Sequence, residues 1–266
     1  MANVEALSGY EHSDGRNRHR VVEAGPDDGP PIILMHEMDG FRDVIVDLIN
    51  RFADAGFNVH APVFFDLSRL GRTAAAAVGF SRICISREFH VLTTRGNSPA
   101  AEWVRSLAAH LGAKGNQKVG VVGMCLTGGL ALAAVVDDSV GAAVAAQPAM
   151  PFANGPPPIG SDARRSSLGL SGAEVDAVRT SGTPILALRF RRDRMSPKER
   201  VEAIDELANG CAVCLSDGEK ELQGHPTLTA AFRYADEKRI RASEMAINET
   251  ISFLDANLGR DSAEHP

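Results

Sequence analysis

KVGVVGMC at residues 118–125, followed directly by LTGGLALAAVVDD at residues 126–138, decides the fold of this 266-residue chain. The first segment is a short apolar run typical of a buried strand, and the second has the apolar spacing of a helix. Cys125 stands at the junction, with Gly123 before it and a pair of glycines soon after it. Small residues let a strand and a helix pack closely around a sharp turn, which projects the side chain at its apex. Cys125 is therefore either a nucleophile at such a turn or a buried structural cysteine.

Strand-like and helix-like segments alternate on both sides of this turn. Strands are expected at 31–37, 58–62, 118–125, 184–190 and 211–217, a strand with its exit loop at 140–150, and a short edge strand at 19–24. Helices are expected at 41–56, 98–112, 126–138 and 196–210, and at 228–258 with a break near 238–242. This alternation predicts an α/β fold with a mostly parallel central sheet and helices on both faces. Ligands bind such sheets at the carboxyl ends of the strands.

The chain length suits one domain of this class. A single domain is expected over residues 18–258, with a polar N-terminal arm or outer strand at 1–17 and a polar tail at 259–266. Residues 151–172 are rich in Pro, Gly and Ser. Long segments of this kind are uncommon inside a compact domain, so we expect a lid or a loop over the sheet edge.

Composition excludes several kinds of partner. The net charge of −6 argues against a nucleic-acid partner, because phosphate binding depends on clustered Lys and Arg. No apolar run approaches the ~18 residues of a membrane span, and the N-terminal residues lack the apolar core of a secretory signal. Four cysteines are too few for a disulfide scaffold. We therefore expect a cytoplasmic protein with free thiols and a small-molecule substrate.

Four reactive residues follow expected strands, namely Glu37, Cys125, Asp193 and His225. The carboxyl ends of parallel strands meet at one edge of a sheet, so these side chains are expected to lie close together. The order Cys125, Asp193, His225 is nucleophile, acid, histidine, which is the order of α/β-hydrolases. The histidine can take the thiol proton and pass it to the leaving group, while the aspartate fixes the histidine tautomer.

Further groups around Cys125 have expected roles. A cysteine at a helix N-terminus is favoured as the thiolate. The backbone N–H groups of Leu126 and Met38 are the expected donors to a developing oxyanion. Glu37 is costly to bury without a partner. It is either a base that helps to ionise Cys125 or a carboxylate paired with a nearby arginine.

The segments around these residues resemble the dienelactone hydrolase (carboxymethylenebutenolidase) family over roughly residues 30–255. The resemblance is carried by PIILMHEMDGFRDVIVDLINRFADAGFNVHAPVFFD, KVGVVGMCLTGGLALA, RFRRDRMSP and GHPTLT, in this order. It implies an α/β-hydrolase fold, no cofactor, and opening of a lactone or small ester through an acyl-enzyme. It also implies that Cys125, Asp193 and His225 form the triad and that Glu37 is the activating glutamate.

The chain departs from the family pattern at two places. Thr127 replaces a glycine in the G-x-C-x-G-G turn, and PTLT at 226–229 stands where an arginine usually holds a substrate carboxylate. Arg233 lies further along, so Arg82 or Arg87 is the expected replacement cation. These departures leave open an alternative, a catalytically weak hydrolase-fold protein that binds a small carboxylate.

Two other patterns carry less weight. Cys211 and Cys214 have a redox spacing, but they lie in an expected strand, where side chains three residues apart point to opposite faces. We expect them to be structural, although pairing between them would indicate a thiol-redox protein. His12 and His19 lie in the polar arm and are too scattered for a metal site, so no metal is expected.

Overall fold

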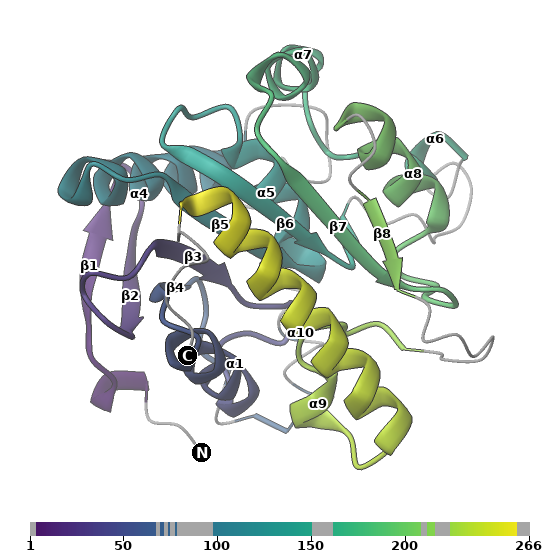
Figure 1. Cartoon of the computed structure of the whole chain (residues 1–266), viewed down its shortest axis with the longest axis horizontal. Helices are drawn as coiled ribbons and strands as arrows, with labels where there is room; N and C mark the ends of the chain where they lie inside the picture. Colours follow the sequence, from purple (N-terminus) through teal and green to yellow (C-terminus); the bar gives the residue numbers. More distant parts are fainter. Residues whose placement is uncertain are drawn as a thin grey trace.

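A computed structural model describes residues 4–67, 70–71, 74, 78, 98–150, 162–208, 212–215 and 224–259 of the chain. Its strands form an eight-stranded sheet in the order β1-β2-β4-β3-β5-β6-β7-β8 (Figure 1). The strands are β1 Gly9–Ser13, β2 Arg18–Ala24, β3 Pro31–Met35, β4 Asn58–Val63, β5 Val119–Met124, β6 Val140–Ala146, β7 Ile185–Phe190 and β8 Ala212–Leu215. From β4 to β8 all neighbours are parallel, whereas the β1–β2 and β2–β4 pairs are antiparallel. The predicted mostly parallel sheet is therefore confirmed.

Helices cover both faces of the sheet (Figure 1). They are η1 Val4–Ala6, α1 Asp43–Asp54, α4 Pro99–Gly115, η3 Cys125–Thr127, α5 Gly128–Ala134, α6 Asp162–Arg165, α7 Gly172–Ser181, α8 Lys198–Leu207, α9 Ala230–Arg233 and α10 Glu237–Leu258. One apolar core joins α4, α5, α7 and α8 to the sheet, and a second core joins α1 and α10 to the opposite face. Among the described helices, none is long and apolar enough to cross a membrane.

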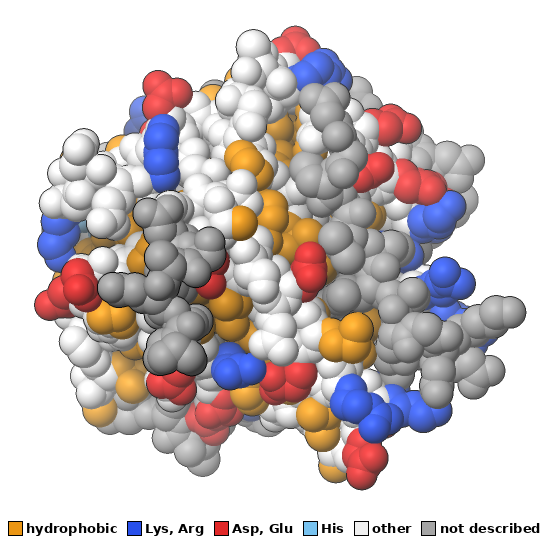
Figure 2. All heavy atoms as spheres, viewed as in Figure 1, with side chains coloured by type: hydrophobic (Ala, Val, Ile, Leu, Met, Phe, Trp, Pro, Cys, Tyr) orange, Lys and Arg blue, Asp and Glu red, His pale blue; other side chains and the backbone are white. Residues whose placement is uncertain are grey.

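The cores follow from the spacing of apolar residues. Helix α1 buries Ile45, Leu48, Ile49 and Phe52, which lie three and four positions apart on one face. Strands β3 and β5 are buried at every position, as expected for central parallel strands covered on both sides. On the face that α10 crosses, acidic and basic side chains are interspersed, with small hydrophobic patches between them (Figure 2).

Several element boundaries differ from the sequence-based expectations. Helix α4 continues past Gly112 and ends at Asn116, which takes up the left-handed conformation with φ 50°. A side chain at Gly112 would lie 3.0 Å from the Ser139 side chain, so this glycine serves packing instead of ending the helix. The break in the C-terminal helical segment lies between α9 and α10, where Asp236 caps α10 by accepting the Lys238 N–H. The strand at the edge of the sheet is β1, which belongs to the expected polar arm. Strand β2, where the edge strand was expected, lies between β1 and β4.

Some predicted features lie outside the described residues. These are Arg82 and Arg87, the expected carboxylate-binding cations, together with Cys211, one of the two cysteines with a redox spacing. Of the expected lid or loop at 151–172, only residues 162–172 are described, and they comprise α6 and the approach to α7.

The strand order places a topological switch point at the centre of the sheet. Strand β3 pairs with β4 on one side and with β5 on the other, so the chain reverses its direction across the sheet between β3 and β5. In open parallel sheets, ligands bind at the carboxyl ends of the strands beside such a switch point. Glu37 leaves β3 and Cys125 leaves β5 at this place.

Candidate active site

Cys125 occupies a strained turn between β5 and α5. Its φ is +54°, in the left-handed region that residues other than glycine rarely adopt. Such a conformation costs on the order of 1–3 kcal/mol and persists only where the surrounding structure imposes it. The side chain is buried, with 3% of its surface exposed. This is the sharp strand-to-helix turn that the sequence predicts.

The glycines beside Cys125 make this turn possible. A Cβ atom on Gly123 would lie 2.2 Å from the Thr127 carbonyl oxygen, and one on Gly128 would lie 2.9 Å from the Pro148 Cα. Both approaches involve backbone atoms that cannot move aside. A side chain at either position would therefore displace the turn.

Thr127, which replaces a family glycine, fits without strain. Its φ is −87°, a value open to any residue. The hydroxyl oxygen accepts the Met124 N–H at 2.8 Å, and it lies 3.0 Å from the Met124 carbonyl oxygen and 3.2 Å from the His36 carbonyl oxygen. The Thr127 hydroxyl therefore lies where the turn approaches the residue that follows β3.

His225 and Asp193 form a hydrogen-bonded pair. The His225 Nδ1 lies 2.8 Å from the Asp193 Oδ2, while the Asp193 Oδ1 accepts the N–H groups of Met195 and Ser196 at 2.8 and 3.1 Å. Buried Arg189 donates to the carbonyl oxygens of Asp193 and Ser196, both at 3.0 Å. These bonds fix the loop after β7, so the carboxylate is held in position for the imidazole.

The electrostatics of His225 link it to Cys125. The pKa of His225 is raised well above its ordinary value: burial lowers this pKa, but the charge of Cys125 and the hydrogen bond with Asp193 raise it by more. A side-chain interaction with Cys125 also raises this pKa, and the Nε2 atom of the imidazole is buried. The structure thus brings together Cys125, His225 and Asp193, with one imidazole nitrogen on the aspartate and the other available for chemistry.

Glu37 lies in a buried ionic cluster. Its Oε2 accepts hydrogen bonds from Arg233 and, at 3.1 Å, from the Thr229 hydroxyl. Arg233 also donates to the Asp39 carboxylate, with an N–O distance of 2.7 Å. The side chains of Arg233, Glu37 and Asp39 are all less than a tenth exposed. Of the two interpretations for Glu37, the structure shows the carboxylate paired with an arginine.

Gln147 is a site residue that the sequence analysis missed. It directly follows β6, is fully buried and has φ +37°. Its amide nitrogen donates to the Glu37 Oε1 at 2.8 Å, and its amide oxygen accepts the Thr227 N–H at 3.1 Å and the Thr227 hydroxyl. Gln147 therefore connects the end of β3 with the loop that carries His225. A polar residue directly after an apolar strand was the signal that could have identified it.

The expected oxyanion donors lie at the switch point. Met38 follows Glu37 in the loop after β3, and its N–H donates to no acceptor in the described part of the chain. Leu126 is the second residue of η3, where N–H groups lack acceptors within the helix. That both N–H groups point at a substrate oxygen stays a prediction. Among the described residues there is no cluster of three or more His, Cys, Asp or Glu side chains that could hold a metal ion.

Comparison with known proteins gives consistent findings. The sequence pattern that defines the dienelactone hydrolase family matches residues 20–257. A putative dienelactone hydrolase from Klebsiella pneumoniae has 18% sequence identity and a TM-score of 0.63, with 93% of this chain and 98% of that chain covered. An esterase from Pyrococcus furiosus has 13% identity and a TM-score of 0.60, covering 95% and 93%.

A dienelactone hydrolase-like promiscuous phosphotriesterase from metagenomic libraries has 14% identity and a TM-score of 0.58, covering 95% of this chain and 98% of that chain. No curated protein sequence matches the chain. At these identities the structures share the α/β-hydrolase fold with this chain, which confirms the predicted fold class.

Proposed function

This chain belongs to the dienelactone hydrolase family, whose members act on ester bonds, and on that premise we propose that it hydrolyses a lactone or a small carboxylic ester with Cys125 as nucleophile. The observation that carries the proposal is that Cys125, Asp193 and His225, which follow the parallel strands β5, β7 and β8 in the chain, interact with one another. Cys125 raises the pKa of His225, and His225 is hydrogen-bonded to Asp193. A nucleophile, a base and an orienting acid are therefore available in one buried site.

The reaction follows from these contacts. His225 takes the thiol proton of Cys125, which leaves a thiolate beside an imidazolium. The thiolate attacks the carbonyl carbon, and the N–H groups of Leu126 and Met38 stabilise the oxyanion. The His225 Nε2–H then protonates the leaving oxygen as the C–O bond breaks, which produces an acyl-enzyme. Water, deprotonated by His225, hydrolyses the thioester, and the thiolate–imidazolium pair is restored.

Glu37 is proposed as a positioning residue of this site. Both of its carboxylate oxygens accept hydrogen bonds, from Gln147 on one side and from Arg233 and Thr229 on the other. A carboxylate held in this way would have to leave Arg233 before it could take the Cys125 proton. We therefore assign the role of base to His225 and propose that Glu37 holds the loop that carries Met38.

The acyl-enzyme provides a direct test. Mixing the protein with excess p-nitrophenyl acetate should release a burst of about one p-nitrophenol per active site if deacylation is slow. Mass spectrometry of the acid-quenched, digested protein should then find one acetyl group on the peptide that contains Cys125. A panel of small lactones would measure ring preference. Cys125→Ala is the control. Acetylation at another residue, or binding of small carboxylates without turnover of any panel member, would contradict the proposal.

The ionic state of the site is tested by the titration of His225. NMR of ¹³C-labelled histidine should place the pKa of His225 above the ordinary 6.5 in the wild type, and Cys125→Ala should lower it, because burial remains and the charge of Cys125 is lost. The imidazolium is the proton donor to the leaving group. The value of kcat/KM should therefore fall as pH rises through this raised pKa.

The raised pKa of His225 also contributes to folding stability. This contribution is present at low pH and is lost as the pH rises through the pKa of the folded state.

Asp193→Asn removes a second interaction that raises the pKa of His225, so it should move the alkaline limb of the pH–rate profile to lower pH. A pKa of His225 that is the same in wild type and Cys125→Ala would exclude the ion pair.

A further inference from the structure

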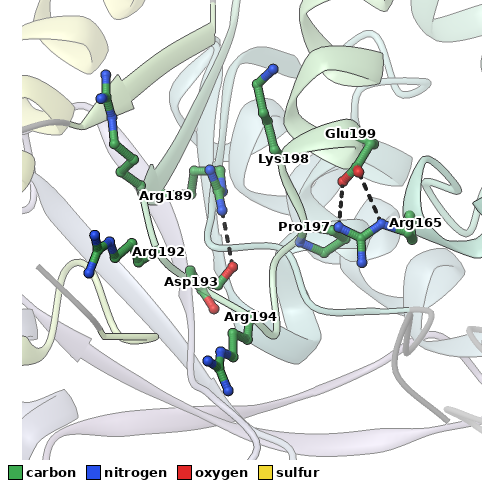
Figure 3. Close-up of a pocket in the computed structure, with 9 residues that line it drawn as sticks. Arg165, Arg189, Arg192, Asp193, Arg194, Pro197, Lys198 and Glu199 are labelled. Carbon is green, nitrogen blue, oxygen red and sulfur yellow. Dashed lines mark hydrogen bonds and ion pairs between the residues drawn. The ribbon is translucent and has the colours of Figure 1, made fainter. Parts of the chain in front are cut away.

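A cleft of about 860 Å³ opens beside Asp193, on the loop after β7 and the start of α8 (Figure 3). Six cationic side chains line it: Arg165, Arg189, Arg191, Arg192, Arg194 and Lys198. Two carboxylates, those of Asp193 and Glu199, accompany them. The cleft therefore carries an excess of positive charge, whereas the whole chain has a net charge of −6. The cleft is therefore a local region of positive potential on an acidic protein, which concentrates anions from solution.

Part of this positive charge is already neutralised. Arg165 donates two hydrogen bonds to Glu199, both of 3.0 Å, and Lys198 forms an ion pair of 2.6 Å with Glu202. Arg189 donates to backbone carbonyl oxygens, as described above. These groups line the walls of the cleft, and the rest of its positive charge comes from other arginines.

Arg191 and Arg192 remain as uncommitted cations. Both side chains are exposed, and neither guanidinium forms a hydrogen bond or ion pair with a described residue. Figure 3 shows Arg192 and Arg194 on either side of Asp193, with Pro197 between Asp193 and the Arg165–Glu199 pair. A planar guanidinium group can donate two parallel hydrogen bonds to two oxygens of one phosphate. Several such groups along one cleft suit an anion that carries several charges.

The N-terminus of α8 opens into the same cleft. The helix has ten residues, its N-cap is Pro197, and no side chain caps its first N–H groups. Pro197, Lys198 and Glu199 all line the cleft. A helix N-terminus carries partial positive charge and presents backbone N–H donors, so it adds to the attraction for an anion.

We propose that this cleft binds a ligand that carries a pyrophosphate or a similar group of linked phosphates. Its volume lies within the range of about 300–1,000 Å³ of small-molecule sites and exceeds what one carboxylate needs. Asp193, whose side chain is 1% exposed, belongs both to the wall of the cleft and to the His225 pair, so the cleft adjoins the proposed hydrolytic site at this residue. The phosphate is either a tail on the substrate itself or a free ligand.

Binding is measured directly with inorganic pyrophosphate. Isothermal titration should give saturable binding of one pyrophosphate per chain, weakened by added NaCl. Arg191→Gln and Arg192→Gln should each weaken the affinity by about tenfold or more, because each removes charge-assisted hydrogen bonds. Arg241 is an exposed arginine on α10 outside the cleft, so Arg241→Gln should leave the affinity for pyrophosphate unchanged. The absence of binding by the wild type, or an equal loss in Arg241→Gln, would overturn the proposal.

A kinetic comparison separates the two sources of phosphate. Two esters that differ only in a terminal phosphate group are assayed with the wild type and with the Arg191→Gln/Arg192→Gln double variant. For a substrate tail, the phosphate should lower KM in the wild type but not in the double variant, with kcat little changed. For a free ligand, both esters should have the same KM. Cys125→Ala should still bind pyrophosphate, so the site is tested independently of the proposed hydrolysis.

Discussion

Replacing Cys125 by alanine is expected to lower kcat/KM for the best ester or lactone by a factor of about 10⁴–10⁶. The substitution removes the atom that forms the bond to the acyl carbon, while His225 and the proposed oxyanion donors remain. Alanine retains the Cβ atom, so the strained backbone at φ +54° is unchanged and the fold should be kept. Cys125→Ser should also lose about a thousandfold or more, because the hydroxyl does not ionise beside His225 as a thiol does.

Steady-state kinetics with matched controls would measure this effect. Cys214→Ala removes a thiol from β8, the edge strand that β6 and β7 separate from β5, and should retain the wild-type kcat/KM. Thermal unfolding of each variant shows whether a loss of activity comes from unfolding. A folded Cys125→Ala protein that keeps activity within tenfold of the wild type would mean that another group attacks the substrate.

The fold could be predicted because its central strands are buried on both faces. Strands β3 and β5 are apolar throughout, and they alternate with amphipathic segments such as α1. Residues placed directly after such strands must meet at one edge of the sheet, whatever their separation along the chain. Cys125 and Asp193, which follow β5 and β7, are therefore expected at the same edge from the sequence alone.

The ionic cluster around Glu37 could not be predicted in the same way. Glu37 meets Gln147 across 110 residues and Arg233 across 196 residues, and both contacts depend on side-chain directions that periodicity does not give. The Thr127 position shows a second limit. The sequence shows only that a family glycine is replaced, whereas the φ of −87° shows that glycine is not required there.

Replacing Arg233 by methionine is expected to destabilise the protein by about 3–5 kcal/mol, the usual cost of removing one partner from a buried ion pair. Two carboxylates, Glu37 and Asp39, would remain buried without their cation. For a chain of this size the Tm should fall by roughly 6–20 °C. The loss should be smaller at pH 4 than at pH 8, because a buried carboxylate without its cation can take up a proton at the lower pH.

Urea unfolding of Arg233→Met, with the exposed Arg241→Met as the matched control, would measure this loss. The control should change the free energy of unfolding by less than about 0.5 kcal/mol. Adding Glu37→Gln to Arg233→Met should recover part of the stability, since it removes one of the two unpaired charges, and a double-mutant cycle gives the coupling. Equal stabilities of Arg233→Met and Arg241→Met would show that the cluster contributes nothing to folding. In that case Glu37 would be free to leave Arg233 at little cost, and a direct role for its carboxylate in ionising Cys125 would become the better explanation for its position.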